Sequence, residues 1–105
     1  MPMTNPSSGA PAGSLLRLLK AKGQLLEPNL FIGKAGLSAE FYRSLDAEFG
    51  LRELVKVKFM AFKEEKKELV KQLVTTSASH LVMRVGNVAV LYRVNPDPAK
   101  RKFET

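Results

Sequence analysis

Cysteine is absent from this chain, and histidine occurs only once, as His80. The absence of cysteine excludes a disulfide scaffold, a thiolate metal cluster and a cysteine nucleophile. A transition-metal site would depend on one imidazole and carboxylates, and no acidic residue lies close to His80 in sequence to orient it as a catalytic triad requires. The patterns G-x-x-x-x-G-K-[ST] and G-x-G-x-x-G are also missing. We therefore predict no metal site, no catalytic residues and no small-molecule substrate, so the protein is not expected to be an enzyme.

Long apolar runs are lacking as well. No stretch approaches the roughly 20 residues that cross a bilayer. Residues 1–13 lack the basic start and the apolar run of a secretory signal, and we interpret them as a flexible tail. We expect a soluble, cytoplasmic protein that does not bind membranes.

Basic residues, in contrast, are in excess. Seventeen Lys and Arg against ten Asp and Glu give a net charge of +7. The excess is uneven, with +1 over residues 1–50 and +6 over residues 51–105. Such charge suits binding to nucleic acid, but it would also suit an acidic protein partner or an anionic membrane surface. A local motif is therefore needed to distinguish among these three classes of partner.

Three helices are predicted from caps and apolar periodicity. Ser14 can cap a first helix, and Gly23 is suited to end it. Ser38 can cap a second helix that Gly50 ends, in which aromatic and leucine side chains recur every four residues. A third helix is expected over residues 63–78.

Four strands are predicted between and after these helices. Residues 30–32 form a short apolar run typical of a buried strand, and residues 53–60 alternate apolar and basic side chains. Residues 81–85 and 88–93 are separated by Gly86 and Asn87, which indicates a tight hairpin.

The resulting order, α-β-α-β-α-β-β, predicts an α+β two-layer fold in which helical crossovers join the early strands and a hairpin forms the end of the domain. Right-handed crossovers place the helices mainly on one face of the sheet. Lys56 and Lys58 would project from the other, open face, where Arg84 and Arg93 could join them. We expect one domain over residues 14–95, followed by a basic tail over residues 96–105.

The segment Gly33-Lys34-Ala35-Gly36 is the strongest candidate for a binding site. It lies between a predicted strand and a predicted helix, where unpaired main-chain N–H groups and the helix dipole favour an anion. Two glycines allow close approach to the backbone, and Lys34 adds a cation. The GxxG loop of KH modules binds nucleotide phosphates in this way. Two glycines in a turn can also be present only because the backbone conformation of the turn requires them.

Other cations extend this candidate site. Lys56 and Lys58 have no acidic neighbour at i±2 in their strand and are interpreted as phosphate contacts. Weaker candidates for such contacts are Arg17, Lys20 and Arg93. The lysines of the third helix can pair with Glu64 and Glu68 three residues away, which favours a solvated, ion-paired surface. Exposed aromatic rings for base stacking are not expected, because the phenylalanines of the predicted helix and strand suit the core.

Several segments together resemble the YhbY-type CRM domain, an RNA-binding family with a KH-like shape. They are Leu19-Lys20, Pro28, Ile32-Gly33-Lys34-Ala35-Gly36-Leu37, Leu54-Val55-Lys56-Val57-Lys58-Phe59, and Gly86 with Val90-Leu91-Tyr92-Arg93. Their order and spacing, over residues 14–94, make the resemblance specific.

The resemblance implies three helices on a four-stranded mixed sheet, no cofactor, and binding to structured RNA. Single-domain bacterial members are associated with precursors of the large ribosomal subunit, so it implies a ribosome assembly factor that binds ribosomal RNA, here expected as a monomer. The alternative is a basic protein-interaction module that docks an acidic or ribosomal protein.

Overall fold

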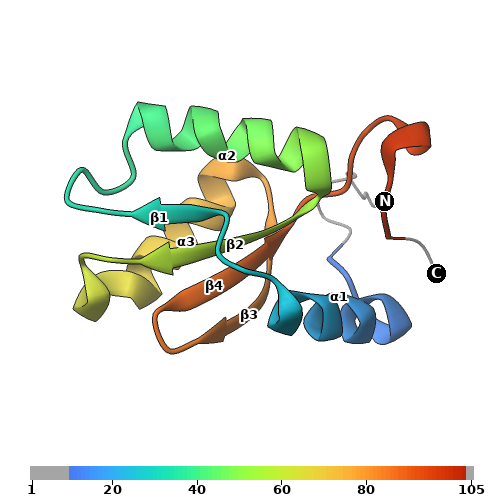
Figure 1. Ribbon diagram of the computed structural model, residues 1–105, viewed down its shortest axis with the longest axis horizontal. Coiled ribbons are helices and arrows are strands. Elements are labelled where there is room, and N and C mark those ends of the chain that lie inside the picture. Colours follow the sequence, from blue (N-terminus) through green and yellow to red (C-terminus); the bar gives the residue numbers. More distant parts are fainter. Residues whose placement is uncertain (1–9, 104–105) are drawn as a thin grey trace, which may run out of the picture.

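The computed structural model describes residues 10–103. The tail predicted over residues 1–13 lies outside this range up to residue 9. The helices and strands alternate at first and end in a hairpin (Figure 1). In chain order they are α1 (Gly13–Leu25), β1 (Leu30–Ile32), α2 (Ala39–Arg52), β2 (Leu54–Phe59), the 3-10 turn η2 (Lys63–Glu65), α3 (Lys66–Ser77), β3 (His80–Val85), β4 (Val88–Tyr92) and the 3-10 turn η3 (Pro98–Lys100).

The sheet is mixed, with strand order β1-β2-β4-β3. β1 and β2 are parallel, whereas β4 runs antiparallel to both of its neighbours, β2 and β3. The parallel pair needs a crossover, which α2 supplies, and the hairpin joins β3 to β4 directly. This arrangement confirms the predicted α+β fold with a four-stranded mixed sheet.

One face of the sheet packs against α2 and α3. The stripe of Phe41, Leu45 and Phe49 on α2 is buried, as its four-residue spacing predicted. These side chains meet the alternate residues of β2 that point to the same face, and Leu73 of α3 packs into the same cluster. The period of two along β2 therefore sets which residues enter the main core.

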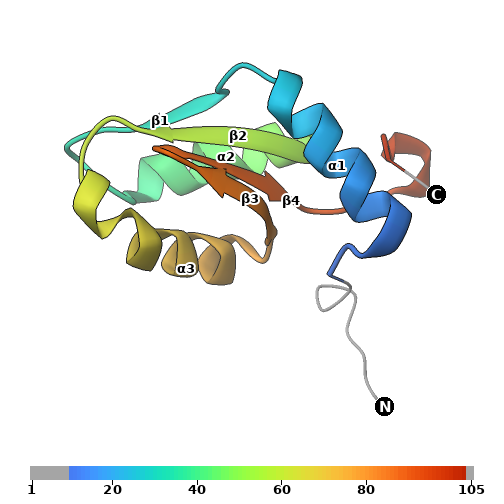
Figure 2. The same ribbon diagram turned by 90° about the horizontal axis from the view of Figure 1, so that it is seen from below.

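The opposite face is not fully open, because α1 covers one end of it (Figure 2). Gly23 lies inside α1 rather than at its end, and a Cβ built there would be 3.0 Å from Cγ1 of Val90. The missing side chain lets the helix approach β4 closely. Two of the three helices share a face, as predicted, but α1 packs on the face that was expected to be free.

Two helix boundaries also differ from the sequence prediction. α1 begins at Gly13 and its N-cap, Ala12, makes no side-chain cap, so Ser14 is not the cap residue. α2 continues past Gly50 to Arg52, which forms an ion pair of 2.8 Å with Glu48 one turn earlier. Glu53, with φ of 48°, ends this helix in the left-handed region although it is not glycine.

The C-terminal segment folds back onto the domain. The fully buried carboxylate of Glu53 accepts hydrogen bonds from the main-chain N–H groups of Asn95 and Lys102. Phe103 stands edge-on to Tyr92, with 6.5 Å between ring centroids, in the cluster beneath α1. Residues 96–102 are exposed, as expected of a basic tail, but the segment is attached to the domain through the N–H of Lys102 and the ring of Phe103. No helix within residues 10–103 is long and apolar enough to span a membrane.

Candidate nucleic-acid interface

The Gly33-Lys34-Ala35-Gly36 loop is an exposed, closed turn at the end of β1. The N–H of Gly36 donates to the carbonyl oxygen of Gly33 at 2.9 Å, which places Lys34 and Ala35 at the corners. Gly33, Lys34 and Ala35 are exposed. Gly36 has φ of +68°, a conformation that strains any residue with a side chain, so this glycine is required by the turn itself.

The two corner amides of the turn are free for a ligand. Within residues 10–103 the N–H groups of Lys34 and Ala35 donate to no other group, whereas that of Gly36 closes the turn. Adjacent exposed N–H groups in a tight turn form a concave seat for anionic oxygen, and the Lys34 side chain adds positive charge beside it.

The loop is separate from the N-terminus of α2, which corrects the sequence prediction that the helix dipole lies at the loop. Leu37 and Ser38 intervene, and Ser38 caps the helix as predicted: its Oγ accepts from the N–H of Phe41 at 3.1 Å. Its carbonyl oxygen accepts from Tyr42. Because the dipole acts mainly within the first turn, the seat for an anion is formed by the loop's own amides and Lys34.

A shallow depression adjoins the loop along the outer edge of β1. Three of the four loop residues line it, together with Phe31 and the first turn of α2. Glu40 is the one acidic side chain on this lining. The turn therefore faces solvent and is not enclosed by acidic residues.

Phe31 is the residue that sequence reasoning missed. Its side chain is 55% exposed, whereas its neighbour Ile32 is fully buried. The apolar run of residues 30–32 predicts a buried strand, but successive strand residues point to opposite faces. Since Ile32 enters the core, the alternation could have placed Phe31 on the opposite face of the sheet, but its exposure follows from α1, which leaves that face uncovered at this end.

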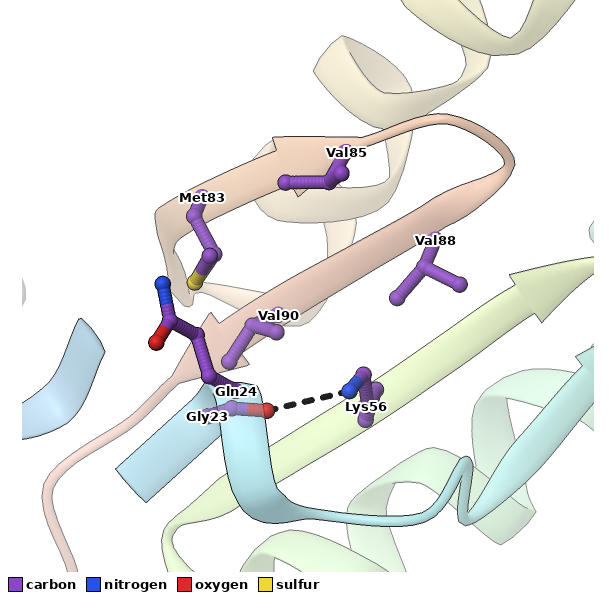
Figure 3. Close-up of a pocket in the computed structure, with 7 residues that line it drawn as sticks. All are labelled: Gly23, Gln24, Lys56, Met83, Val85, Val88 and Val90. Atoms are coloured by element: carbon purple, nitrogen blue, oxygen red, sulfur yellow. Dashed lines mark hydrogen bonds between the residues drawn. The ribbon is translucent and has the colours of Figure 1, made fainter. Parts of the chain in front are cut away.

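Lys56 and Lys58 share a face of β2 but have different surroundings. Lys58 is exposed and makes no ion pair or hydrogen bond with its side chain among the described residues. The ammonium of Lys56 instead donates to the carbonyl oxygens of Gly23 at 3.1 Å and Leu26 at 2.8 Å, at the end of α1. Figure 3 shows Lys56 directed at Gly23 across a pocket that Met83, Val85, Val88 and Val90 also line.

Arg93 lies on the other face of the sheet. Its Nη1 donates to Asp46 and to the carbonyl oxygen of Ser77, both at 2.9 Å, and its guanidinium carbon is 4.6 Å from the centroid of the Phe49 ring. The side chain therefore joins α2 to the end of α3. Arg84 pairs in register with buried Ala89 and shares that face, so neither arginine joins Lys58 as the sequence suggested.

The remaining predicted cations are spread over the surface. Arg17 and Lys20 are exposed on α1, and both views place this helix toward the end of the molecule away from the β1–α2 loop.

Ion pairs within the described residues join Arg52 to Glu48 and Arg93 to Asp46, so the pairs predicted along α3 with Glu64 and Glu68 are not formed.

Comparison with known proteins gives consistent matches. The family model for the CRS1 / YhbY (CRM) domain matches residues 13–93. The chain is 34% identical over 82 residues to the Pseudomonas aeruginosa protein named "Probable RNA-binding protein PA4753", covering 77% of this chain and 79% of that one. It is 33% identical over 82 residues to the Bacillus subtilis "Probable RNA-binding protein YqeI", covering 77% and 85%. The solution structure of a Staphylococcus aureus protein, described as "a putative RNA binding protein", has a TM-score of 0.72 at 28% identity, covering 89% of this chain and 98% of that one.

Proposed function

The chain belongs to the CRS1 / YhbY (CRM) domain family, and from this premise we propose that it binds RNA through the turn at residues 33–36. The observation that carries the proposal is the exposed pair of free amides at Lys34 and Ala35, beside a lysine ammonium. Phosphate oxygen is the matching ligand, because it accepts several N–H bonds and carries the opposite charge. Lys58 extends the positive surface along the sheet.

The finer proposal is that the RNA is ribosomal, in precursors of the large subunit, and that the protein acts in the cytoplasm as a non-catalytic assembly factor. Its support is the resemblance to bacterial members of this family that are associated with precursors of the large subunit. Phosphate contacts fix position and orientation without reading sequence, which suits a protein that recognises a folded RNA by shape.

The test reverses the charge of the turn. Lys34→Glu combined with Ala35→Asp should weaken RNA binding at least tenfold, because it puts two carboxylates where phosphate would sit. The melting temperature should change little, since both side chains are exposed. Affinity for a hairpin RNA is measured by fluorescence anisotropy, with unfolding followed by circular dichroism.

A matched control carries the same change of charge elsewhere. Lys71 and Gln72 are adjacent exposed residues on α3, so Lys71→Glu with Gln72→Asp changes net charge equally. Binding that is unaltered in the loop variant, or equally weakened in the control, removes the loop from the mechanism.

The ribosomal assignment is tested in cell extracts. The protein should co-purify with large-subunit precursors, and nuclease treatment should release it. Association that survives removal of RNA would favour the rival function, a module that docks a ribosomal protein.

A further inference from the structure

A row of side chains crosses the whole sheet at the end that α1 leaves uncovered. In register, Phe31 of β1 pairs with Lys58 of β2, Lys58 pairs with Val88 of β4, and Val88 pairs with Val85 of β3. Residues paired across strands point to the same face. The row therefore presents one aromatic ring, one cation and two valines side by side, on strands about 4.8 Å apart.

Three residues of this row are exposed and Val88 is half-buried, although the composition of the row is largely apolar. Phe31 is 55% and Val85 62% exposed, and Lys58 is also exposed. The next row toward α1 contains Lys56, Val90 and Met83 and lines a pocket with Gly23 and Gln24 at the end of that helix (Figure 3). Val85 and Val88 of the outer row line the far side of the same pocket. α1 thus ends before the outer row, and no segment of residues 10–103 lies over it (Figure 2).

The row adjoins the turn at residues 33–36, which is the proposed phosphate-binding site. Phe31 is two residues before Gly33, and both line the depression at the edge of β1. An exposed ring beside a phosphate-binding turn is one arrangement by which proteins bind single-stranded RNA, because bases stack on the ring while cations hold the backbone. Four-stranded sheets of other RNA-binding modules stack two or three bases in this way.

We propose that this outer row binds unpaired nucleotides of the RNA whose backbone lies on the turn at residues 33–36. One base stacks on Phe31, and Lys58 pairs with the neighbouring phosphate. The inference rests on the proposed RNA binding and names its substrate class: RNA with unpaired bases next to the phosphates that the loop holds. Positive charge at the centre of the row, within a chain of net charge +7, favours a polyanion over a neutral apolar partner.

The first test compares two RNA probes and two variants. The probes are a hairpin with an unpaired loop and a blunt duplex of the same stem. The wild-type protein should prefer the hairpin. Phe31→Leu, which removes the ring but keeps an apolar side chain, should bind the hairpin about tenfold less tightly, within the range measured for base stacking on aromatic residues. Phe31→Trp keeps a stacking surface and should bind as tightly as the wild type or more so.

The second test separates stacking from charge. Because Phe31 contacts no phosphate, Phe31→Leu should leave the slope of log affinity against log salt unchanged. Lys58→Gln should make that slope shallower by about 1, as expected for one lost phosphate contact. Equal slopes for Lys58→Gln and the wild type would overturn the role of Lys58.

The outcomes distinguish failure of the inference from failure of the proposed function. If the wild-type protein binds neither probe, RNA binding itself is wrong. If it binds hairpin and duplex equally well and Phe31→Leu has no effect, RNA binding stands and the unpaired-base site does not exist. If Phe31→Leu leaves RNA affinity intact but abolishes association with ribosomal proteins after RNA removal, the row docks a protein and the inference is overturned.

Discussion

At the scale of single residues, Lys56 and Lys58 show that two lysines on one strand can have different roles, because only one of them lies within reach of α1. Both project from the same face of β2. The ammonium of Lys56 binds two carbonyl groups at the end of α1, where the helix dipole also favours a cation. That of Lys58 stays in solvent. We therefore assign Lys56 mainly to holding α1 on the sheet, and its contact with RNA remains a proposal.

Replacing Lys56 tests this division. Lys56→Met keeps the apolar stem but loses both hydrogen bonds, and should lower the free energy of unfolding by about 1 to 3 kcal/mol. Lys58→Gln should change it by less than about 0.5 kcal/mol, as is usual for an exposed side chain. Urea unfolding measures both. Equal stability of the two variants would contradict the structural role of Lys56.

At the scale of elements, the C-terminal segment depends on one buried carboxylate. Both oxygens of Glu53 accept main-chain N–H groups of this segment. Asn95 adds to the attachment, since its side-chain amide donates to the main-chain carbonyl oxygen of Gly50. The main-chain carbonyl oxygen of Asn95 accepts from Nε of Arg101 within the segment. The segment in turn carries Phe103 to the cluster beneath α1.

Glu53→Gln should release this segment. The substituted amide group would face an N–H donor and leave it unsatisfied, so we expect a loss of about 1 to 3 kcal/mol in the free energy of unfolding. Trypsin should then cleave faster between Lys100 and Lys102. Asp97→Asn is a matched control, because the exposed Asp97 caps only the local turn at Ala99. Unchanged proteolysis in Glu53→Gln would show that other contacts hold the segment.

At the scale of the whole molecule, the candidate contacts divide between two ends. The loop and the outer row lie at one end of the sheet, whereas α1, with Arg17 and Lys20, lies toward the other. The described chain extends 37 Å along its longest axis. An RNA that used all of these groups would have to run along much of that axis.

The salt dependence of binding tests the size of this footprint. If roughly four phosphates are neutralised, log affinity should fall against log salt with a slope of about −3 to −4. Arg17→Gln with Lys20→Gln should make the slope shallower by about 2 for a long structured RNA. Affinity that is independent of salt would exclude phosphate binding, and an unchanged slope in the double variant would place α1 outside the interface.

The sequence by itself determined the order of the helices and strands and the position of the turn at residues 33–36, although it did not give the exact helix ends. Alternation along β2, the spacing of Phe41, Leu45 and Phe49, and the cap at Ser38 act over a few residues, so their effects can be predicted locally. Gly33 and Gly36 likewise indicate the turn through their local spacing alone.

Only the tertiary structure decided which side chains are free to bind a ligand. The local sequence predicts that Gly23 ends a helix, whereas in the structure it lies within α1 and allows the helix to approach Val90 closely. Lys56 and Arg93 read as free cations, but partners distant in sequence bind them. Phe31 reads as core, but the edge of the sheet exposes it. Each of these outcomes depends on which segment packs over a residue, and a single sequence does not encode that in its local pattern.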